Sequence, residues 1–303
     1  NAITGFSTFT TSGTGNVVWD NGTTNLFLGD SGIGGNLTLI SGGTISDAGG
    51  ALITVGGASS FTTDVADKAI TLNNTTNIFT GAVSFNTSGT AGHTLLDNGS
   101  TNIVLGTSAA GGNLSLKTTG TVTQSVGTSI SAAGLELLDS SGVTLTEALN
   151  NVTNIAANTA GPISYRDADA LNVDAVNGTS GITTSNDNVT LTTGGNLAVN
   201  QAMDLASGAV SGGGTLVLDS DGTITQLAGG SVQAKSLELI GVGNIDLQPS
   251  AGNDVDTVAG VSSAGFIAYT DANDVTVGTV NASSGLSAVD PTGYDVFIKG
   301  TSV

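Results

Sequence analysis

The sequence has no cysteine and is poor in histidine, proline and aromatic residues, with one His, three Pro and 4% aromatic residues in 303 positions. Without cysteine the chain has no disulfide bridges, thiolate metal sites or thiol nucleophiles. Charged residues make up only 10% of the chain, against roughly a quarter in a typical soluble protein. Because soluble helices need charged faces, this composition favours strands and turns.

Positive charge is especially scarce, and the net charge is −19. The five cations are scattered through the chain: Lys68, Lys117, Arg166, Lys235 and Lys299. They form no phosphate-binding stripe, so we expect no nucleic-acid partner and no anionic lipid surface as a partner. No apolar run of about 18 residues is present, so we expect no membrane insertion. The chain begins at Asn1 without a visible secretory signal, which predicts a mature product or an excised segment.

Repetition is what the sequence has in abundance. Nearly the same phrase occurs as GNLTLISGGTISDA from Gly35, GNLSLKTTGTVTQS from Gly112 and GTLVLDSDGTITQL from Gly214. The triplet at 20–22 recurs at an offset of 77, and the triplet at 135–137 recurs at an offset of 102. Long repeats of unequal length are typical of solenoids and domain arrays.

A finer pattern of apolar-x-apolar triplets, such as Leu37/Leu39 and Leu114/Leu116, lies beneath these repeats. Period-two alternation predicts short strands with one buried face. The triplets start about 20 or eight residues apart, which indicates a coil of roughly 20 residues that holds more than one strand. A string of antiparallel sandwiches would keep one repeat length and a buried aromatic residue. Trp19, the sole tryptophan, is matched by Leu96 in the next repeat, which disfavours sandwiches. A solenoid explains both offsets, since 77 residues make about four coils and 102 residues about five.

We therefore predict an all-β, parallel β-solenoid of roughly 15 coils without helical caps. It would run continuously over 1–303, in long repeats of about 1–77, 78–180 and 181–303. Asn36 and Asn113 occupy matched corners and predict a ladder that satisfies corner amides, although Asn also simply favours turns. A terminal coil is an open strand edge. The chain is thus expected to continue in a longer protein or to associate with itself, end to end or laterally.

The phrases GGNLTLISGGTISDAGG, TGAVSFNTSGT and GTVTQSVGTSISAAGLELLDSSGVTL resemble the repeat region of filamentous haemagglutinin-like bacterial exoproteins. The resemblance covers nearly the whole chain. It implies a right-handed parallel β-helix in a secreted or cell-surface adhesin, a biofilm matrix or an extracellular filament. Members are commonly exported through a secretion domain with Asn-Pro motifs, and no Asn-Pro pair occurs in this sequence.

Few residues suggest catalysis. His93 is the only histidine, and we expect it to be a turn residue. Polysaccharide-active β-helix enzymes use clustered Asp with Ca²⁺ or a basic residue, and Arg166-Asp167-Ala168-Asp169 is the best match to such a cluster. Its repeat counterpart, Thr270-Asp271-Ala272-Asn273, lacks the arginine, which favours a structural corner. Carboxylates paired only in space for glycoside hydrolysis stay open at this point, but we predict no catalytic residues and no enzyme.

No cofactor or metal site is predicted, and weak calcium binding is the runner-up. Alternating oxygen ligands suited to Ca²⁺ occur at Asp219-Ser220-Asp221, Asp254-Val255-Asp256 and Asp271-Ala272-Asn273-Asp274. Solvated turn carboxylates are the simpler interpretation, because no complete calcium-loop motif is present. The Asn-x-Ser/Thr sequons at Asn21 and Asn98 are expected by chance in such a composition.

Two functions from different classes remain. The first is an extracellular structural protein, a rigid segment of a surface adhesin or self-assembling fibre. The second is a carbohydrate-binding or polysaccharide-active module with a glycan or cell-surface ligand. A stacked row of aromatic residues would favour the second function, but the sequence shows scattered Phe together with Tyr165, Tyr269 and Tyr294. Tyr165 and Tyr269 occupy matched repeat positions, which favours a core or corner role.

Overall fold

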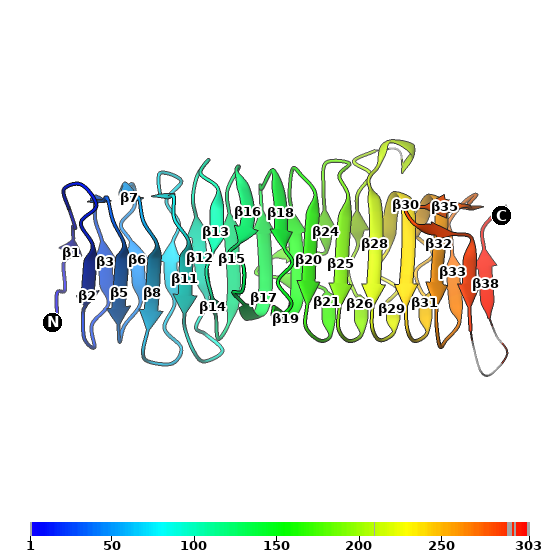
Figure 1. The fold of residues 1–303 in the computed structure, drawn as a ribbon, viewed down its shortest axis with the longest axis horizontal. Helices are drawn as coiled ribbons and strands as arrows, with labels where there is room; N and C mark the ends of the chain where they lie inside the picture. Colours follow the sequence, from blue (N-terminus) through cyan, green and yellow to red (C-terminus); the bar gives the residue numbers. More distant parts are fainter. Residues whose placement is uncertain (1, 209, 290–292, 294, 302–303) are drawn as a thin grey trace. The chain divides into compact units, whose positions relative to one another are not determined.

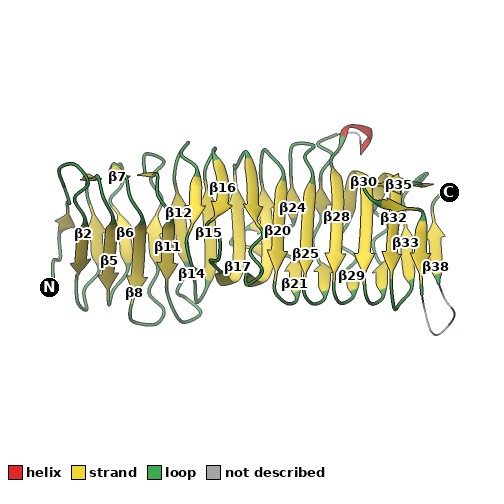
Figure 2. Cartoon of the chain, in the orientation of Figure 1, coloured by secondary structure: helices red, strands yellow, loops and turns green. Residues whose placement is uncertain are grey.

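The computed structural model of the chain describes residues 2–208, 210–289, 293 and 295–301. About 51% of the chain is β-strand, and the described residues contain one short 3-10 helix, η1 (Val210–Gly212), and no α-helix (Figure 2). Within those residues, no helix has the length and apolarity needed to cross a membrane. The chain separates into two compact units, unit 1 (Asn1–Val152) and unit 2 (Thr153–Val303).

Unit 1 is built from short strands that follow one another closely. They are β1 (Phe6–Ser7), β2 (Val17–Asp20), β3 (Leu26–Leu28), β4 (Ser31–Ile33), β5 (Leu37–Ser41), β6 (Ile45–Asp47), β7 (Ile53–Val55), β8 (Ser59–Thr63), β9 (Ile70–Leu72), β10 (Ile78–Phe79), β11 (Val83–Asn86), β12 (Thr94–Asp97), β13 (Ile103–Leu105), β14 (Ser108–Ala109), β15 (Asn113–Lys117), β16 (Thr121–Gln124), β17 (Ile130–Leu138) and β18 (Gly142–Leu145). The boundary with unit 2 falls within β19 (Asn151–Asn158).

Unit 2 continues with strands of the same kind. They are β20 (Ile163–Asp167), β21 (Leu171–Val173), β22 (Ala175–Val176), β23 (Thr179–Ser180), β24 (Ile182–Thr183), β25 (Val189–Thr193), β26 (Leu197–Val199), β27 (Met203–Asp204), β28 (Thr215–Ser220), β29 (Ile224–Gln226), β30 (Val232–Gly241), β31 (Ile245–Leu247), β32 (Asp254–Ser262), β33 (Ile267–Thr270), β34 (Thr276–Val277), β35 (Thr279–Val280), β36 (Ser283–Ser284), β37 (Leu286–Ala288) and β38 (Val296–Lys299).

Strands of unit 1 pair in parallel with the equivalent strand one coil away. Strand β5 lies between β2 and β8 (Figure 1). In this register Leu39 pairs with Trp19 on one side and with Phe61 on the other. Both Leu39 and Phe61 are fully buried, while Thr38 between the apolar positions of β5 points outward. The period-two pattern thus stacks apolar side chains into a continuous core, and the predicted in-register β-solenoid is confirmed.

Unit 2 repeats the arrangement with coils of variable length. Strand β28 lies between β25 and β30, so Leu216 pairs with Val189 at an offset of 27 and with Leu237 at an offset of 21. The longer coil contains η1 in the connection that precedes β28. Because several coils exceed 20 residues, the chain makes about 13 turns, somewhat fewer than the predicted 15.

Two antiparallel hairpins, absent from the predicted elements, interrupt the parallel pattern of unit 2. They are β22–β23 and β35–β36, which occupy matched repeat positions. Asn177 and Asn281 adopt positive φ angles of 53° and 48° in the two turns, a conformation that Asn tolerates in tight hairpins. In the second hairpin, Asn281 and Ser283 each donate a 2.6 Å hydrogen bond to the buried carboxylate of Glu238 on β30. That carboxylate holds the hairpin against the sheet.

The corners of unit 1 are closed by side chains that cap backbone amides of the next coil. Asn16 Oδ1 accepts a hydrogen bond from the Asn36 N–H at 2.7 Å, and Asn36 Oδ1 accepts one from the Ala58 N–H at 2.9 Å. His93 takes the same role in the following repeat, where its Nδ1 accepts the Asn113 N–H at 3.0 Å. The predicted ladder is therefore confirmed at Asn36, as a side chain-to-backbone ladder, and His93 is a turn residue as predicted.

Candidate functional site

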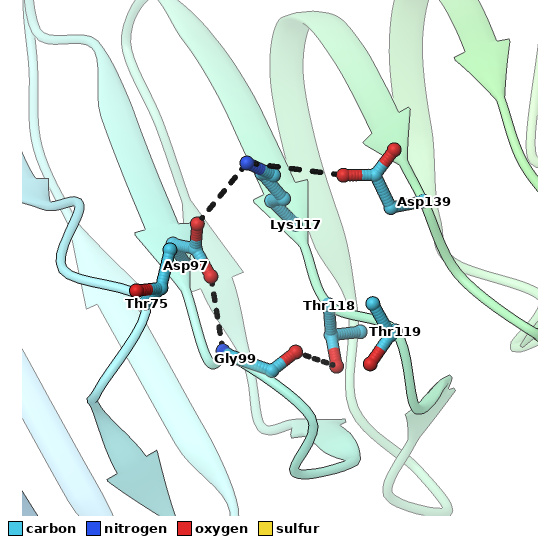
Figure 3. A pocket seen from close by; sticks show the side chains of 7 residues that line it. All are labelled: Thr75, Asp97, Gly99, Lys117, Thr118, Thr119 and Asp139. Atoms are coloured by element: carbon cyan, nitrogen blue, oxygen red, sulfur yellow. Dashed lines mark hydrogen bonds and ion pairs between the residues drawn. The ribbon is translucent and has the colours of Figure 1, made fainter.

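A small hollow on the outer face of unit 1 gathers charged side chains from three successive coils (Figure 3). Asp97 ends β12, Lys117 ends β15 directly beside it in register, and Asp139 follows β17. Thr75, Gly99, Thr118 and Thr119 complete the lining, and the volume is about 220 Å³. The site arises because parallel in-register pairing carries matched outward positions to the same place on the surface.

Lys117 lies between the two carboxylates. Its Nζ is 3.4 Å from Asp97 Oδ2 and 3.8 Å from Asp139 Oδ2. The Asp97 side chain is only 6% exposed and also accepts a 2.9 Å hydrogen bond from the Gly99 N–H through Oδ1. Asp139 is half exposed and has a left-handed φ of 60°. The cluster therefore links three coils by charge, with the strongest contribution expected at the buried partner, since exposed ion pairs contribute little.

The same repeat position carries the opposite charge in unit 2. At the offset of 102, Lys117 corresponds to Asp219 on β28. Burial raises the pKa of Asp219, and the nearby carboxylates of Asp221 and Glu238 raise it further, while the positive charge of Arg166 lowers it. Unit 2 therefore has negative charge at the position where unit 1 has the Lys117 ammonium group.

The acidic cluster predicted around Arg166 does not converge on a groove. Arg166 is exposed, whereas Asp167 on the same strand is fully buried and points to the opposite side of the sheet. Asp167 Oδ2 accepts the Tyr165 hydroxyl at 2.7 Å, and Oδ1 accepts the Asp169 N–H at 3.1 Å. These contacts close a turn, so the prediction of a structural corner is confirmed.

The matched corner in the next repeat has the same construction. The Tyr269 hydroxyl donates to Asp271 Oδ2, and Asp271 Oδ1 accepts the Asn273 N–H at 3.0 Å. Burial is the main cause that raises the pKa of both tyrosines well above the usual range, and the paired carboxylates add to it. Burial also raises the pKa of Asp271, although its hydrogen bonds oppose that shift. Tyr165 and Tyr269 are core residues, as predicted, and Tyr294 lies outside the described residues.

Each segment considered for calcium has at least one side chain engaged in another contact. Ser220 points inward and donates to the Gly195 carbonyl at 2.7 Å, between the outward Asp219 and the exposed Asp221. Asp254 Oδ1 accepts the Asn273 side-chain amide at 3.1 Å. In the part of the chain that the structure describes, no three His, Cys, Asp or Glu side chains are grouped to hold a metal ion. The prediction of no cofactor, with weak calcium binding as the runner-up, stays a prediction.

Two residues noted only as chance sequons have a structural role that sequence reasoning missed. Asn21 and Asn98 are fully buried. Asn98 Oδ1 accepts the Phe79 N–H at 2.8 Å, and its Nδ2 donates to the Phe79 carbonyl at 3.1 Å. Asn21 bonds Ile3 in the same two ways, at 2.9 and 3.1 Å. The side-chain amide thus makes the pair of backbone hydrogen bonds that a neighbouring strand would make. The recurrence of the Asp-Asn-Gly triplet was the sequence signal that could have indicated this role.

The stacked, in-register coils within each unit define a β-solenoid repeat protein. Residues 14–86 and 91–159 match the model of a family described as repeats of unknown function (DUF5649). Two consecutive matches agree with the internal repetition at an offset of 77. No curated protein and no solved structure matches the chain.

Proposed function

We propose that the chain is a rigid structural segment of an extracellular surface adhesin or filament. The observation that carries the proposal is the set of contacts that join each coil to the next. Buried apolar columns, parallel ladders and side-chain caps all join each coil to the next. Such a structure derives its stability from nearest neighbours, so it can be lengthened by repetition while keeping its stiffness.

The chemistry of the outer surface fits this role. Polar residues occupy many of the outward positions, such as Thr38 and Asp219, and the net charge is −19. A polar, acidic surface of this kind favours solubility. The charged cluster at Lys117 is used to join coils rather than left open for chemistry. The resemblance to filamentous haemagglutinin-like exoproteins supports an extracellular location in bacteria, and self-association or continuation in a longer chain would extend the structure.

Immunogold electron microscopy on intact and permeabilised cells of the source organism tests the proposal. We expect antibodies raised against the purified chain to label the outside of intact cells or extracellular fibres. Labelling confined to permeabilised cells would contradict the proposal. A strain that lacks the coding sequence is the control for antibody specificity.

A further inference from the structure

Three shallow hollows lie next to one another on the first coils of unit 1. The first is lined by Thr4, Gly5, Phe6 and Phe27. The second shares Phe6 and adds Thr8, Gly29, Asp30 and the turn at 48–51. The third shares Asp30 and adds Thr10, Ser31, Gly32, Leu52 and Thr54. Because Phe6 and Asp30 each belong to two hollows, the three form one continuous track, the Phe6 track.

Aromatic surface forms one end of the Phe6 track. Phe6 on β1 is 70% exposed, although a large apolar side chain is ordinarily buried. Strand pairing places Phe6 directly beside Phe27 of β3, and both side chains lie on the outward face. In the sequence these two phenylalanines look scattered, because they are 21 positions apart and meet only through the coil register.

Polar groups line the rest of the Phe6 track. Thr8 and Thr10 are exposed, and Thr54 is half-buried on β7. The exposed carboxylate of Asp30 accepts a 2.9 Å hydrogen bond from the Leu52 N–H through Oδ1, which anchors it between two hollows. Leu52 itself is 46% exposed. The track thus alternates apolar surface with hydroxyl and carboxylate groups.

We propose that the Phe6 track binds an uncharged, linear glycan chain. A pyranose ring has an apolar C–H face, which packs on aromatic surface, and a rim of hydroxyls, which pair with groups such as Thr hydroxyls and a carboxylate. The hollows have volumes of about 290, 360 and 290 Å³. Each is at or near the lower limit for a drug-sized ligand, so an extended chain with successive units in successive hollows fits better than one compact molecule.

The charge of the lining residues favours neutral over acidic glycans. The described residues that line the three hollows include one carboxylate, Asp30, and no Lys, Arg or His. The whole chain carries a net charge of −19. An acidic polysaccharide would meet repulsion with no compensating ion pair, whereas a neutral chain would not. This binding role is separate from the proposed structural role, and its test does not depend on cellular location.

Isothermal titration of the full chain with a neutral oligosaccharide panel tests the proposal, with cellohexaose, xylohexaose and mannohexaose as the probes. We expect at least one to bind and Phe6→Ala to weaken that binding tenfold or more, while Phe6→Trp retains it. Phe297→Ala is the matched control, because Phe297 is an exposed phenylalanine (52%) on β38 of unit 2. It is expected to bind like the wild type. Circular dichroism spectra would verify that each variant is folded.

Several results would overturn the proposal. These are no binding by any neutral probe, equal loss in Phe6→Ala and Phe297→Ala, or binding of heparin-derived hexasaccharide alone. Sedimentation velocity adds one more outcome. If self-association of the wild type disappears in Phe6→Ala while no glycan binds, a second copy of the chain occupies the track instead. None of these results would alter the immunogold test of the structural role.

Discussion

Replacing Asn98 by alanine should destabilise unit 1 far more than replacing Asn36, although both asparagines lie at coil corners. Asn98 is fully buried and makes four hydrogen bonds through its side chain. Asn36 is exposed, and its side-chain oxygen Oδ1 accepts the hydrogen bond of the Ala58 N–H. The two variants remove the same chemical group, so they isolate the effect of burial.

The expected magnitude follows from the groups left behind. In Asn98→Ala the Phe79 N–H loses its acceptor in a buried position, which costs about 1–3 kcal/mol. The two N–H groups of the Asn98 amide are shared among the carbonyls of Phe79, Thr101 and Asn102. They contribute roughly 1 kcal/mol each at most, since these carbonyls retain other lone pairs. A total loss of about 4 kcal/mol is therefore expected. In Asn36→Ala, water replaces the cap, and the loss should stay below about 1 kcal/mol.

Urea unfolding followed by tryptophan fluorescence measures this difference. Trp19 is the only tryptophan, lies in unit 1 and packs near Phe9 with ring centroids 5.9 Å apart. Its signal therefore reports on unit 1. Hydrogen exchange at the Phe79 amide gives an independent local measure, because that N–H should exchange much faster in Asn98→Ala.

The reasoning would be refuted if Asn98→Ala and Asn36→Ala lowered the free energy of unfolding by amounts within about 1 kcal/mol of each other. Asn98→Asp adds a second check. A carboxylate retains the shape and the acceptor but cannot donate to the three carbonyls, so it should be as damaging as alanine at neutral pH.

Three further predictions concern the polar contacts of the two units. The pKa of Asp219 is raised above its ordinary value of 3.8, so the folded state binds this proton more tightly than the unfolded state. The contribution of Asp219 to stability therefore falls as the pH rises from below 3.8 through the raised pKa. Urea titrations from about pH 3.5 to 6.5 should therefore show Asp219→Asn gaining stability relative to the wild type as pH rises, and a constant difference would contradict this. Tyr269→Phe removes the donor to the buried Asp271 carboxylate and should cost about 1.5–3 kcal/mol by chemical unfolding; an unchanged midpoint would refute the importance of this corner. Lys117→Met should cost under about 1 kcal/mol at low salt and less at 1 M salt, measured by Trp19 fluorescence, and a larger, salt-independent loss would point to packing instead.

Much of the architecture was predictable because each level of the sequence pointed to the same structure. Leu37 and Leu39 alternate with polar residues, and the same phrase recurs where the next repeats begin. Alternation determines which face of a strand is buried, and recurrence places like residues side by side in successive coils. The structural corner at Asp167 was also predictable, because its repeat counterpart keeps the Asp but not the arginine.

The candidate sites were less accessible from sequence. Asn16 and Asn21 are the same residue type five positions apart. Yet the Asn16 side chain is exposed and caps the Asn36 N–H, whereas the Asn21 side chain is buried and bonds the backbone of Ile3. The hairpin at 279–284 was missed because its turn resembles any other corner until Glu238 is seen to hold it. Composition records that a residue favours turns, but not whether the turn faces water or the core.

By itself, the sequence determined the strand character, the inward and outward faces and the repeated coil of this protein, since these follow from period-two patterning and repetition along the chain. Only the tertiary structure decided which residues meet across coils. Among the described residues, the offset between paired parallel strands ranges from 18 at Asn154 and Asn172 to 29 at Met203 and Val232. That offset depends on how much chain each corner takes up, and the corners have no periodic signal. The pairing of Phe6 with Phe27, and of Lys117 with Asp97, is therefore a property of the folded coils.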